Sequence, residues 1–305
     1  MFCRFFRFFV KRATFSAGKL FYLCKGKDIF NRTACSAATV FIEWGETLSF
    51  IEVKGLRKVY RLGQEKVYAL KNINLNIEKG EICCILGTSG SGKSTLLNML
   101  AGLEKPTRGD IFINGVNIAK LSERKLAKFR QENTGFIFQA YNLLQQLSSL
   151  ENVGMPLMFK GYSRSKRDRE ARKMLKLVGL ESRMKHRPNQ MSGGQQQRVG
   201  IARAFVAKPN VIFADEPTGN LDTKTTTDVM ELMVRMCRKH NLTLILVTHD
   251  LDIAKYADRI VHLIDGDIHS DELNEAIYNP DEAESGSAEN TENTGKEPAE
   301  NETKK

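Results

Sequence analysis

The chain has 305 residues, of which 41% are hydrophobic and 27% are charged, and its formal net charge is +10 at pH 7. A chain of this length can bury a sizeable core in one or two domains. No apolar run approaches the roughly 20 residues that cross a bilayer as a helix, so we expect a protein that is soluble or attached to a membrane through another component. The six cysteines form no C-x-x-C pair, which argues against a zinc site or a redox dithiol and indicates a reducing compartment.

The charge is unevenly distributed along the chain. Residues 265–305 carry thirteen acidic side chains against three lysines, whereas residues 1–47 carry eight basic and three acidic side chains. The body between them is therefore strongly basic, which suits an anionic partner such as a nucleotide, a nucleic acid or the inner face of a membrane. A solvated basic surface has equal weight, because phosphate binding uses few of these charges.

Residues 1–47 differ from the rest of the chain. They begin with phenylalanines interleaved with arginine and lysine, so they lack the uninterrupted apolar core of a secretory signal. We expect residues 1–48 to be a basic N-terminal extension that is either disordered or a misannotated start, with translation beginning at Leu48. A helix lying on an anionic membrane surface is the alternative.

From Ser49 onward the apolar pattern becomes regular, and residues 49–272 are expected to form one domain. Alternation and turn residues predict strands at 50–53, 57–60, 67–70, 73–77 and 110–114, a buried strand at 135–138, and a charged helix at 121–131. Residues 150–184 read as helical and basic, within a helical subdomain at about 140–190. Residues 273–305 are expected to be an acidic, disordered tail.

Two continuous apolar runs, at residues 211–214 and 243–247, are typical of parallel strands that are covered on both faces. Residues 223–240 between them fit a crossover helix. The chain therefore contains the strand–helix–strand pattern of an α/β fold.

The segment Gly87-Thr88-Ser89-Gly90-Ser91-Gly92-Lys93-Ser94 lies between an apolar run and an apolar-periodic segment. Strand, glycine loop and helix in this order are the context in which G-x-x-x-x-G-K-[ST] binds phosphate. Glycines let the backbone direct successive N–H groups at a phosphate chain, and the helix N-terminus adds its positive end. Lys93 would supply a charge to the β- and γ-phosphates, and the Ser94 hydroxyl is placed to ligate Mg²⁺. A plain glycine turn is the alternative, and the eight filled positions disfavour it.

Asp215 and Glu216 close the apolar run 211–214. An acidic residue at the carboxyl end of a buried parallel strand faces the crevice in which α/β sheets bind ligands. Asp215 can hold Mg²⁺ directly or through water, and Glu216 can accept a proton from an attacking water. A strand-end turn is the alternative, because Pro217-Thr218-Gly219 follows; taken alone, the pair is ambiguous.

A second anion-binding helix end is indicated by Ser192-Gly193-Gly194-Gln195, which precedes a helix predicted at 199–207. A serine cap followed by glycines leaves no bulky side chain in the way of a ligand. An ordinary helix cap is the local alternative.

These segments together resemble the motifs of the ABC-type ATPases in order and spacing. The resemblance rests on the glycine loop, Gln139, Met191-Ser192-Gly193-Gly194-Gln195, Asp215-Glu216, Leu221-Asp222 and His249. It covers about residues 50–271, with Met191 where leucine is usual. It implies an α/β fold of the P-loop NTPase class, an ABC-type nucleotide-binding domain with a mixed sheet core, an antiparallel β part and a helical subdomain.

Further details are similar to one group of these ATPases, which serves lipoprotein release, macrolide export and cell division (LolD-, MacB- and FtsE-like). They are Gly135-Phe136-Ile137-Phe138-Gln139, Glu151-Asn152-Val153 followed by Met155-Pro156-Leu157, and the run from Asp215 to Asp222. The resemblance implies a membrane partner with few transmembrane helices and a large extracytoplasmic domain.

The resemblance also implies roles for single residues in a sandwich of two copies of the chain, with ATP and Mg²⁺ between them. ATP would lie on the glycine loop of one copy, formed by Gly87, Thr88, Ser89, Gly90, Ser91, Gly92, Lys93, Ser94 and Thr95. It would be covered by Ser192, Gly193, Gly194 and Gln195 of the other copy. Asp222 would act across the dimer interface, and Gln139 would contact Mg²⁺ and the water and link the site to the membrane subunit.

Glu216 is implied as the general base, and His249 would hold the γ-phosphate and orient the water. A lone histidine after an apolar strand is usually structural, but the Val247-Thr248-His249-Asp250 context favours the functional role. Tyr60 matches the aromatic position that stacks on adenine, with a core tyrosine as the alternative. Mg²⁺ would be held by Ser94, Gln139 and Asp215.

The implied function is an ATP-hydrolysing subunit at the cytoplasmic face of a bacterial membrane, driving a separate permease in export or mechanical transmission. The helical insert would dock the permease, with the contact around residues 141–156. No nucleic-acid partner is expected. The cargo is not encoded here, because members of the group serve lipid-linked proteins, peptides, drugs and cell-wall hydrolase control with similar ATPases.

Three other classes of protein fit the sequence less well. A soluble ABC ATPase of DNA repair or chromosome structure needs a long coiled coil or zinc modules between the glycine loop and Ser192, where this chain has neither heptads nor paired cysteines. An ABC translation factor carries two cassettes, and this chain has one. A nucleotide-binding regulator without turnover would be expected to lack Glu216 or His249, and both are present.

Overall fold

The structure is a computed structural model that describes residues 14–16, 19–21 and 49–274. The chain divides into two units, residues 1–47 and 48–305. In the first unit, β1 (Thr14–Ser16) and β2 (Lys19–Phe21) pair as antiparallel strands. The expectations for the rest of residues 1–48, and for the acidic tail after residue 274, lie outside the described residues.

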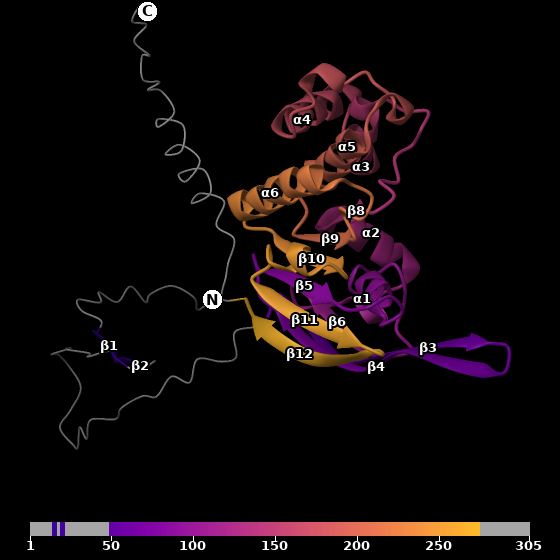
Figure 1. Ribbon diagram of the computed structural model, residues 1–305, viewed down its shortest axis with the longest axis vertical. Coiled ribbons are helices and arrows are strands. Elements are labelled where there is room, and N and C mark those ends of the chain that lie inside the picture. The colour runs from indigo at the N-terminus through magenta and orange to yellow at the C-terminus, as the bar shows by residue number, and fades with distance from the viewer. Residues whose placement is uncertain (1–13, 17–18, 22–48, 275–305) are drawn as a thin grey trace, which may run out of the picture. The chain divides into compact units, whose positions relative to one another are not determined.

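In the second unit, the described residues form two sheets (Figure 1). The antiparallel sheet has the order β4 (Glu65–Ile77), β3 (Ile51–Leu62), β6 (Arg108–Ile113) and β7 (Val116–Asn117). The six-stranded sheet has the order β12 (Asp267–Leu273), β11 (Arg259–Ile264), β5 (Ile82–Leu86), β10 (Thr243–Thr248), β9 (Val211–Asp215) and β8 (Thr134–Phe138). Its strands β11 to β8 are parallel, and β12 adds an antiparallel edge. The mixed sheet and the antiparallel part predicted for the fold are confirmed.

Helices connect and cover these strands. They are α1 (Lys93–Leu100), α2 (Glu123–Asn133), α3 (Ser149–Phe159), α4 (Arg164–Leu177), α5 (Gly193–Val206), α6 (Thr223–His240) and α7 (Leu251–Ala254), with the 3₁₀ turns η1 (Ile118–Lys120), η2 (Glu181–Arg183) and η3 (Pro188–Gln190). In Figure 1, α3, α4, α5 and α6 lie on the same side of the six-stranded sheet, beyond β8 and β9. None of the helices in the described residues is long and apolar enough to span a bilayer.

Strands β5 and β10 of the six-stranded sheet are buried along their whole length because a core lies on each face of the sheet. Along β5, Cys83 and Ile85 belong to the core shared with α1 and the antiparallel sheet, whereas Cys84 points into the core shared with α5 and α6. Cys83 and Cys84 are fully buried. Burial raises the pKa of the Cys84 thiol to about 12, so this thiol is unreactive at neutral pH.

Four predicted sets of element boundaries are wrong. The strands expected at 67–70 and 73–77 form one strand, β4. The strands expected at 50–53 and 57–60 form one strand, β3, because Gly55 (φ +56°) lies in a bulge rather than a turn. The helix expected to begin at Val199 begins six residues earlier, at Gly193. The helical stretch 150–184 divides into α3 and α4, with Gly161 at φ +77° between them.

Strand β8 also differs from the prediction of a buried strand. Among the described strands it is the edge of its sheet and pairs only with β9. Gly135 and Ile137 are buried, but Phe136 and Phe138 on the other face are partly exposed. That partly exposed aromatic face lines a groove described below.

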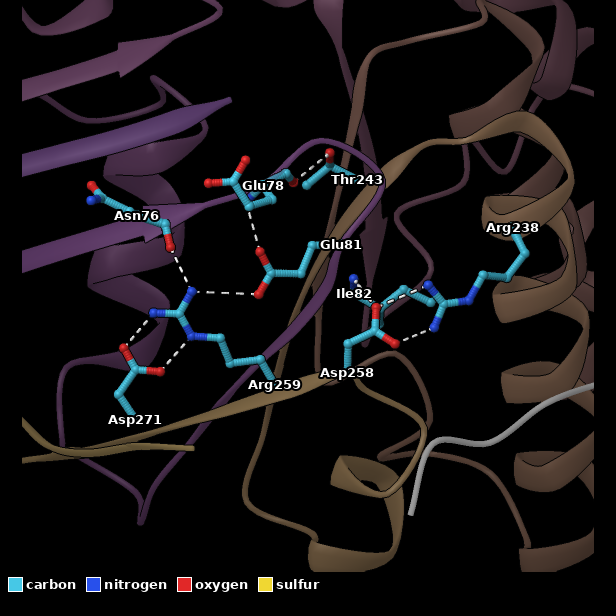
Figure 2. Close-up of polar contacts among 9 residues, drawn as sticks. All are labelled: Asn76, Glu78, Glu81, Ile82, Arg238, Thr243, Asp258, Arg259 and Asp271. Atoms are coloured by element: carbon cyan, nitrogen blue, oxygen red, sulfur yellow. Dashed lines mark hydrogen bonds and ion pairs between the residues drawn. The ribbon is translucent and has the colours of Figure 1, made fainter. Parts of the chain in front are cut away.

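Two arginines stabilise, through ion pairs, the end of the six-stranded sheet where β5 begins (Figure 2). Arg238, in the last turn of α6, makes a two-pronged ion pair with Asp258, and the same carboxylate accepts the Ile82 N–H at 2.8 Å. Arg259, on β11, pairs with Asp271 of β12 at 2.5 Å and also contacts the chain before β5. These contacts hold α6, β5, β11 and β12 together at the edge opposite the glycine loop.

Candidate active site

The glycine loop connects β5 to α1, and its glycines are required by the space around them. A Cβ at Gly87 would lie 2.3 Å from the carbonyl oxygen of Leu263, and a Cβ at Gly92 would lie 2.5 Å from that of Ala69. Gly92 also has φ +100°, in the left-handed region that favours glycine. A larger residue at either position would displace backbone, so the G-x-x-x-x-G spacing follows from packing as well as from phosphate access.

The N-terminus of α1 opens onto this loop. The N–H of Leu96 bonds to the carbonyl of Gly92 at 2.9 Å, and the preceding amides of the first turn have no intrahelical acceptor. The Lys93 side chain is only 6% exposed, and its Nζ donates to the carbonyl of Thr88 at 2.7 Å. Free amides, a helix N-terminus and an ammonium held over the loop form a cradle that fits a phosphate chain.

Ser94 and Asp215 lie next to each other at the mouth of the cradle. The Ser94 hydroxyl donates to Oδ1 of Asp215 at 3.2 Å. Burial raises the pKa of the Asp215 carboxyl, against the opposing effect of the Ser94 hydrogen bond. A hydroxyl and a carboxylate oxygen beside a phosphate site are the donor types that Mg²⁺ prefers, so these two residues fit the ion.

Glu216 and His249 are brought together by neighbouring parallel strands. Glu216 follows β9 and His249 follows β10, so both lie at the carboxyl edge of the sheet. His249 Nδ1 lies 2.9 Å from Oε1 of Glu216. Glu216 has φ +42°, and its N–H donates to the carbonyl of Val247 at 2.9 Å. This pairing provides a carboxylate held by an imidazole at the edge where Asp215 also lies.

Gln139 follows β8 and lies against the segment that follows Glu216. Its carbonyl accepts a hydrogen bond from Asn220 Nδ2 at 3.0 Å. A Cβ added at Gly219 would lie 2.7 Å from Gln139 Nε2. The side chain of Gln139 therefore packs directly over Gly219, close in sequence to the candidate base.

Ser192 caps helix α5, as predicted. Its hydroxyl accepts the N–H of Gln195 at 3.4 Å, and the Gln195 side chain accepts the Ser192 N–H at 3.2 Å. Asp222 caps α6, and hydrogen bonds from the backbone and side chain of Thr225 lower its pKa. Gly194 touches Thr225, with 2.4 Å from an added Cβ to its Cγ2, so the two caps are neighbours.

Within the described residues of this single chain, no hydrogen bond or ion pair joins the Ser192 cap to the glycine loop. The covering of the loop by Ser192 to Gln195 of a second copy stays a prediction.

Tyr60 lies at the side of the cradle. Its hydroxyl donates to Glu104 at 2.7 Å, and Lys58 lies 5.0 Å from its ring centroid and pairs with the same carboxylate. The side chain is partly exposed and belongs to neither core, which disfavours the alternative of a core tyrosine. Stacking on adenine stays a prediction.

Two polar side chains that the sequence reasoning missed lie on α5, amid its apolar residues. Gln197 is fully buried, and its Nε2 donates to the carbonyl of Pro217, next to Glu216. Arg203 is 8% exposed and donates to the carbonyls of Tyr141 and Asn142. The sequence could have indicated both residues, since a polar residue inside an otherwise apolar helical run needs a buried hydrogen-bond partner.

Comparison with known proteins identifies the family. Residues 70–219 match the family model described as ABC transporter. The chain is 45% identical over 223 residues to the lipoprotein-releasing system ATP-binding protein LolD of Geobacter metallireducens, covering 73% of this chain and 99% of that protein. It is also 45% identical over 223 residues to the macrolide export ATP-binding/permease protein MacB of Rhodopirellula baltica, covering 72% of this chain but 33% of that protein.

A solved structure agrees with the fold. The ATP-binding cassette MJ0796, a Methanocaldococcus jannaschii protein, superimposes with a TM-score of 0.69 at 44% identity, covering 73% of this chain and 98% of that chain. That structure is a dimer in a post-hydrolysis state bound to ADP and Pi. The chain therefore belongs to the ABC transporter ATP-binding family, as an ATPase subunit of the LolD/MacB type.

Proposed function

We propose that this subunit hydrolyses ATP with Glu216 as general base and that it drives a separate membrane permease. The observation that carries the catalytic part is the Glu216–His249 pair, at 2.9 Å, beside the Ser94–Asp215 pair. A carboxylate oriented by an imidazole is placed to take a proton from a water attacking the γ-phosphate.

The remaining residues have distinct tasks in this proposal. Lys93 and the amides of the glycine loop bind the phosphates, and Ser94 and Asp215 would hold Mg²⁺, with Gln139 as a further ligand. Bound Mg²⁺ would neutralise charge on the transferred phosphate oxygens. Tyr60 stacks on adenine. Ser192 to Gln195 and Asp222 of a second copy cover the nucleotide, an arrangement supported by the dimeric cassette of MJ0796.

The permease is proposed to dock in a groove of about 840 Å³ beside β8. The groove lies between α2, β8, α3 and α5, and it includes Met155 and Pro156 of the surface predicted for this contact. LolD is named as the ATP-binding protein of a lipoprotein-releasing system, and MacB as an ATP-binding/permease protein. By analogy we place this subunit at the cytoplasmic face of a membrane, driving a partner with a large extracytoplasmic domain.

The catalytic assignment is tested by Glu216→Gln. The amide keeps the shape of the side chain but cannot accept the proton, so turnover should fall by about 10²–10⁴-fold while ATP still binds. The variant should accumulate as an ATP-bound dimer, measured by light scattering during gel filtration. Lys93→Ala is the matched control, because it should lose ATP affinity and stay monomeric. Turnover near the parental rate in Glu216→Gln would show that another residue is the base.

A further inference from the structure

Gln197 of α5 is a buried amide that the hydrolytic mechanism proposed above does not use. Its side chain is 0% exposed, as are those of Val199 and Ile201 on the same helix. Its Nε2 donates to the carbonyl of Pro217. Its Oε1 lies beside Gly200, where an added Cβ would be 3.5 Å away, and among the described residues no donor bonds this oxygen.

A glutamine is an unfavourable choice for the stability of such a position. A buried polar group destabilises the fold unless it is hydrogen-bonded, and one of the two polar atoms of this amide has no partner in the described part of the chain. A methionine of similar length would fill the same space without a polar atom to satisfy. The amide supplies what methionine lacks, a donor directed at the Pro217 carbonyl. The role of Gln197 therefore lies in the turn that it contacts.

That turn carries the candidate base. The Glu216 N–H donates to the carbonyl of Val247 at 2.9 Å, and the Glu216 carbonyl accepts the N–H of Gly219 at 3.2 Å. Pro217 has no N–H to donate, so it is held through its carbonyl, by Gln197. Glu216 has φ +42°, a region that residues with side chains rarely adopt and keep only where the surroundings determine it. Gln197 thus supports the strained backbone from which the Glu216 side chain projects.

The direction of this side chain decides whether Glu216 can act as a base. A general base must lie within hydrogen-bonding reach of the water that it deprotonates, and a displacement of about 1 Å can cost about 10²-fold in rate. His249 contacts the carboxylate end of the side chain at 2.9 Å. Gln197 acts at the other end, on the backbone one residue away, from a helix whose residues are largely buried.

We propose that Gln197 is a positioning residue for hydrolysis: its amide holds the Pro217 carbonyl, and with it the turn that aims the Glu216 carboxylate at the attacking water. The inference rests on the proposed function, because it takes Glu216 as the general base. Gln197 is itself buried and contacts neither nucleotide nor water in this account. Its loss should therefore slow the chemical step and leave nucleotide binding intact.

The first test is Gln197→Met, which removes the donor and keeps the length of the side chain. In ATPase assays of the full chain, kcat should fall by about 10–100-fold while KM for ATP changes by less than about twofold. Thr243→Val is the matched control. Thr243 is also 0% exposed, and its hydroxyl bonds the backbone of Gly80 at 2.9 Å and of Glu78 at 3.4 Å (Figure 2). It lies at the other end of β10 from His249, so its kcat should stay at the parental value.

The Glu216→Gln background separates positioning from loss of folded protein. Adding Gln197→Met there should leave the ATP bound per chain and the ATP-bound dimer unchanged, and less bound ATP would overturn the proposal. In single-turnover assays, Gln197→Met should not lower the residual hydrolysis of Glu216→Gln any further, because both changes act through the same group. An equal factor of loss in both backgrounds would show that Gln197 does not act through Glu216.

Gln197→Asn tests the same hydrogen bond if Gln197→Met does not fold. It keeps an amide, but the side chain is a methylene shorter and cannot reach the Pro217 carbonyl, so kcat should again fall with KM for ATP unchanged. A parental kcat in either variant, alongside a defective Glu216→Gln, would overturn the role of Gln197 alone. Turnover near the parental rate in Glu216→Gln would instead contradict the proposed function, because another group would then be the base.

Discussion

At the scale of single residues, the site combines strain with burial of charge. Glu216 has φ +42°, held by its N–H bond to Val247 and by its contact with His249. Strained backbone is tolerated where the surrounding structure determines it, and it is frequent at functional sites. The neighbouring Asp215 is a carboxylate in a partly desolvated position, which is unfavourable for folding and useful for binding a cation.

Asp215 therefore provides a stability prediction. A carboxyl whose folded-state pKa is raised favours folding when protonated, and that contribution is lost as pH rises through the folded pKa. At pH 7 the ionised group thus reduces stability, and Asp215→Asn should raise Tm by about 1–3 °C while abolishing Mg²⁺-dependent turnover. The gap in Tm between variant and parent should narrow as the pH is lowered from 7 toward 4.5, as differential scanning calorimetry can measure.

Asp222 offers a control of opposite sign. Its folded-state pKa is lowered by hydrogen bonds from Thr225, so its contribution to stability is present above the unfolded pKa and is lost as pH falls. Asp222→Asn should accordingly lower Tm at pH 7. If Asp215→Asn and Asp222→Asn changed Tm in the same direction, the raised pKa of Asp215 would not explain the effect of Asp215→Asn on Tm.

At the scale of elements, α6 links two distant parts of the domain. Asp222 caps its N-terminus, next to the Ser192 cap of α5, and Arg238 in its last turn pairs with Asp258. Because Asp258 also accepts the Ile82 N–H, the helix is fastened to the strand that leads into the glycine loop (Figure 2).

Loss of the Asp258 contacts should lower the free energy of unfolding. Asp258→Ala leaves the Arg238 guanidinium and the Ile82 N–H without their partner, and we predict a loss of about 2–3 kcal/mol in the free energy of unfolding. Asp252→Ala removes the exposed ion pair with Lys255, at 2.6 Å, and should cost less than about 0.5 kcal/mol. Urea titrations followed by circular dichroism would compare them; equal losses would contradict a structural role for the Asp258 contacts.

The elements also show how much of the fold can be predicted from the sequence. The crossover helix at 223–240 and the strand beginning at Thr243 have the expected boundaries, because a capping aspartate and continuous apolar runs are local signals. The edge position of β8 was not predictable in this way. Strand order is set by contacts between distant segments, and the run 135–138 is apolar whether or not its outer face is covered.

The residues of the site divide in the same way, into those with a local sequence signal and those that depend on contacts between distant segments. Motif residues such as Lys93 and Glu216 were found because phosphate and proton chemistry require particular side chains at particular spacings. Arg203 was missed because its role depends on the turn at Tyr141 and Asn142. These residues are 62 and 61 positions away in the chain, and the packing of α5 against β8 brings them close.

At the scale of the whole ATPase domain, two hydrophobic cores enclose one sheet, and the functional groups lie around it. The phosphate cradle and the Glu216–His249 pair occupy the carboxyl edge of the strands, as expected for an α/β sheet. The groove lies at the β8 edge, where Arg203 and Gln139 connect it to that carboxyl edge. This arrangement allows a docked partner and a bound nucleotide to affect the same loop.

The central claim is that this ATPase subunit drives a separate membrane protein. The most direct measurement is to purify the subunit from native membranes, identify what copurifies, and compare the ATPase rate of the complex with that of the subunit alone. We predict a permease with few transmembrane helices and a large extracytoplasmic domain, together with a changed ATPase rate. Recovery of only ribosomes or nucleic acid would contradict the claim and leave the assignment of the hydrolytic site to be judged by Glu216→Gln.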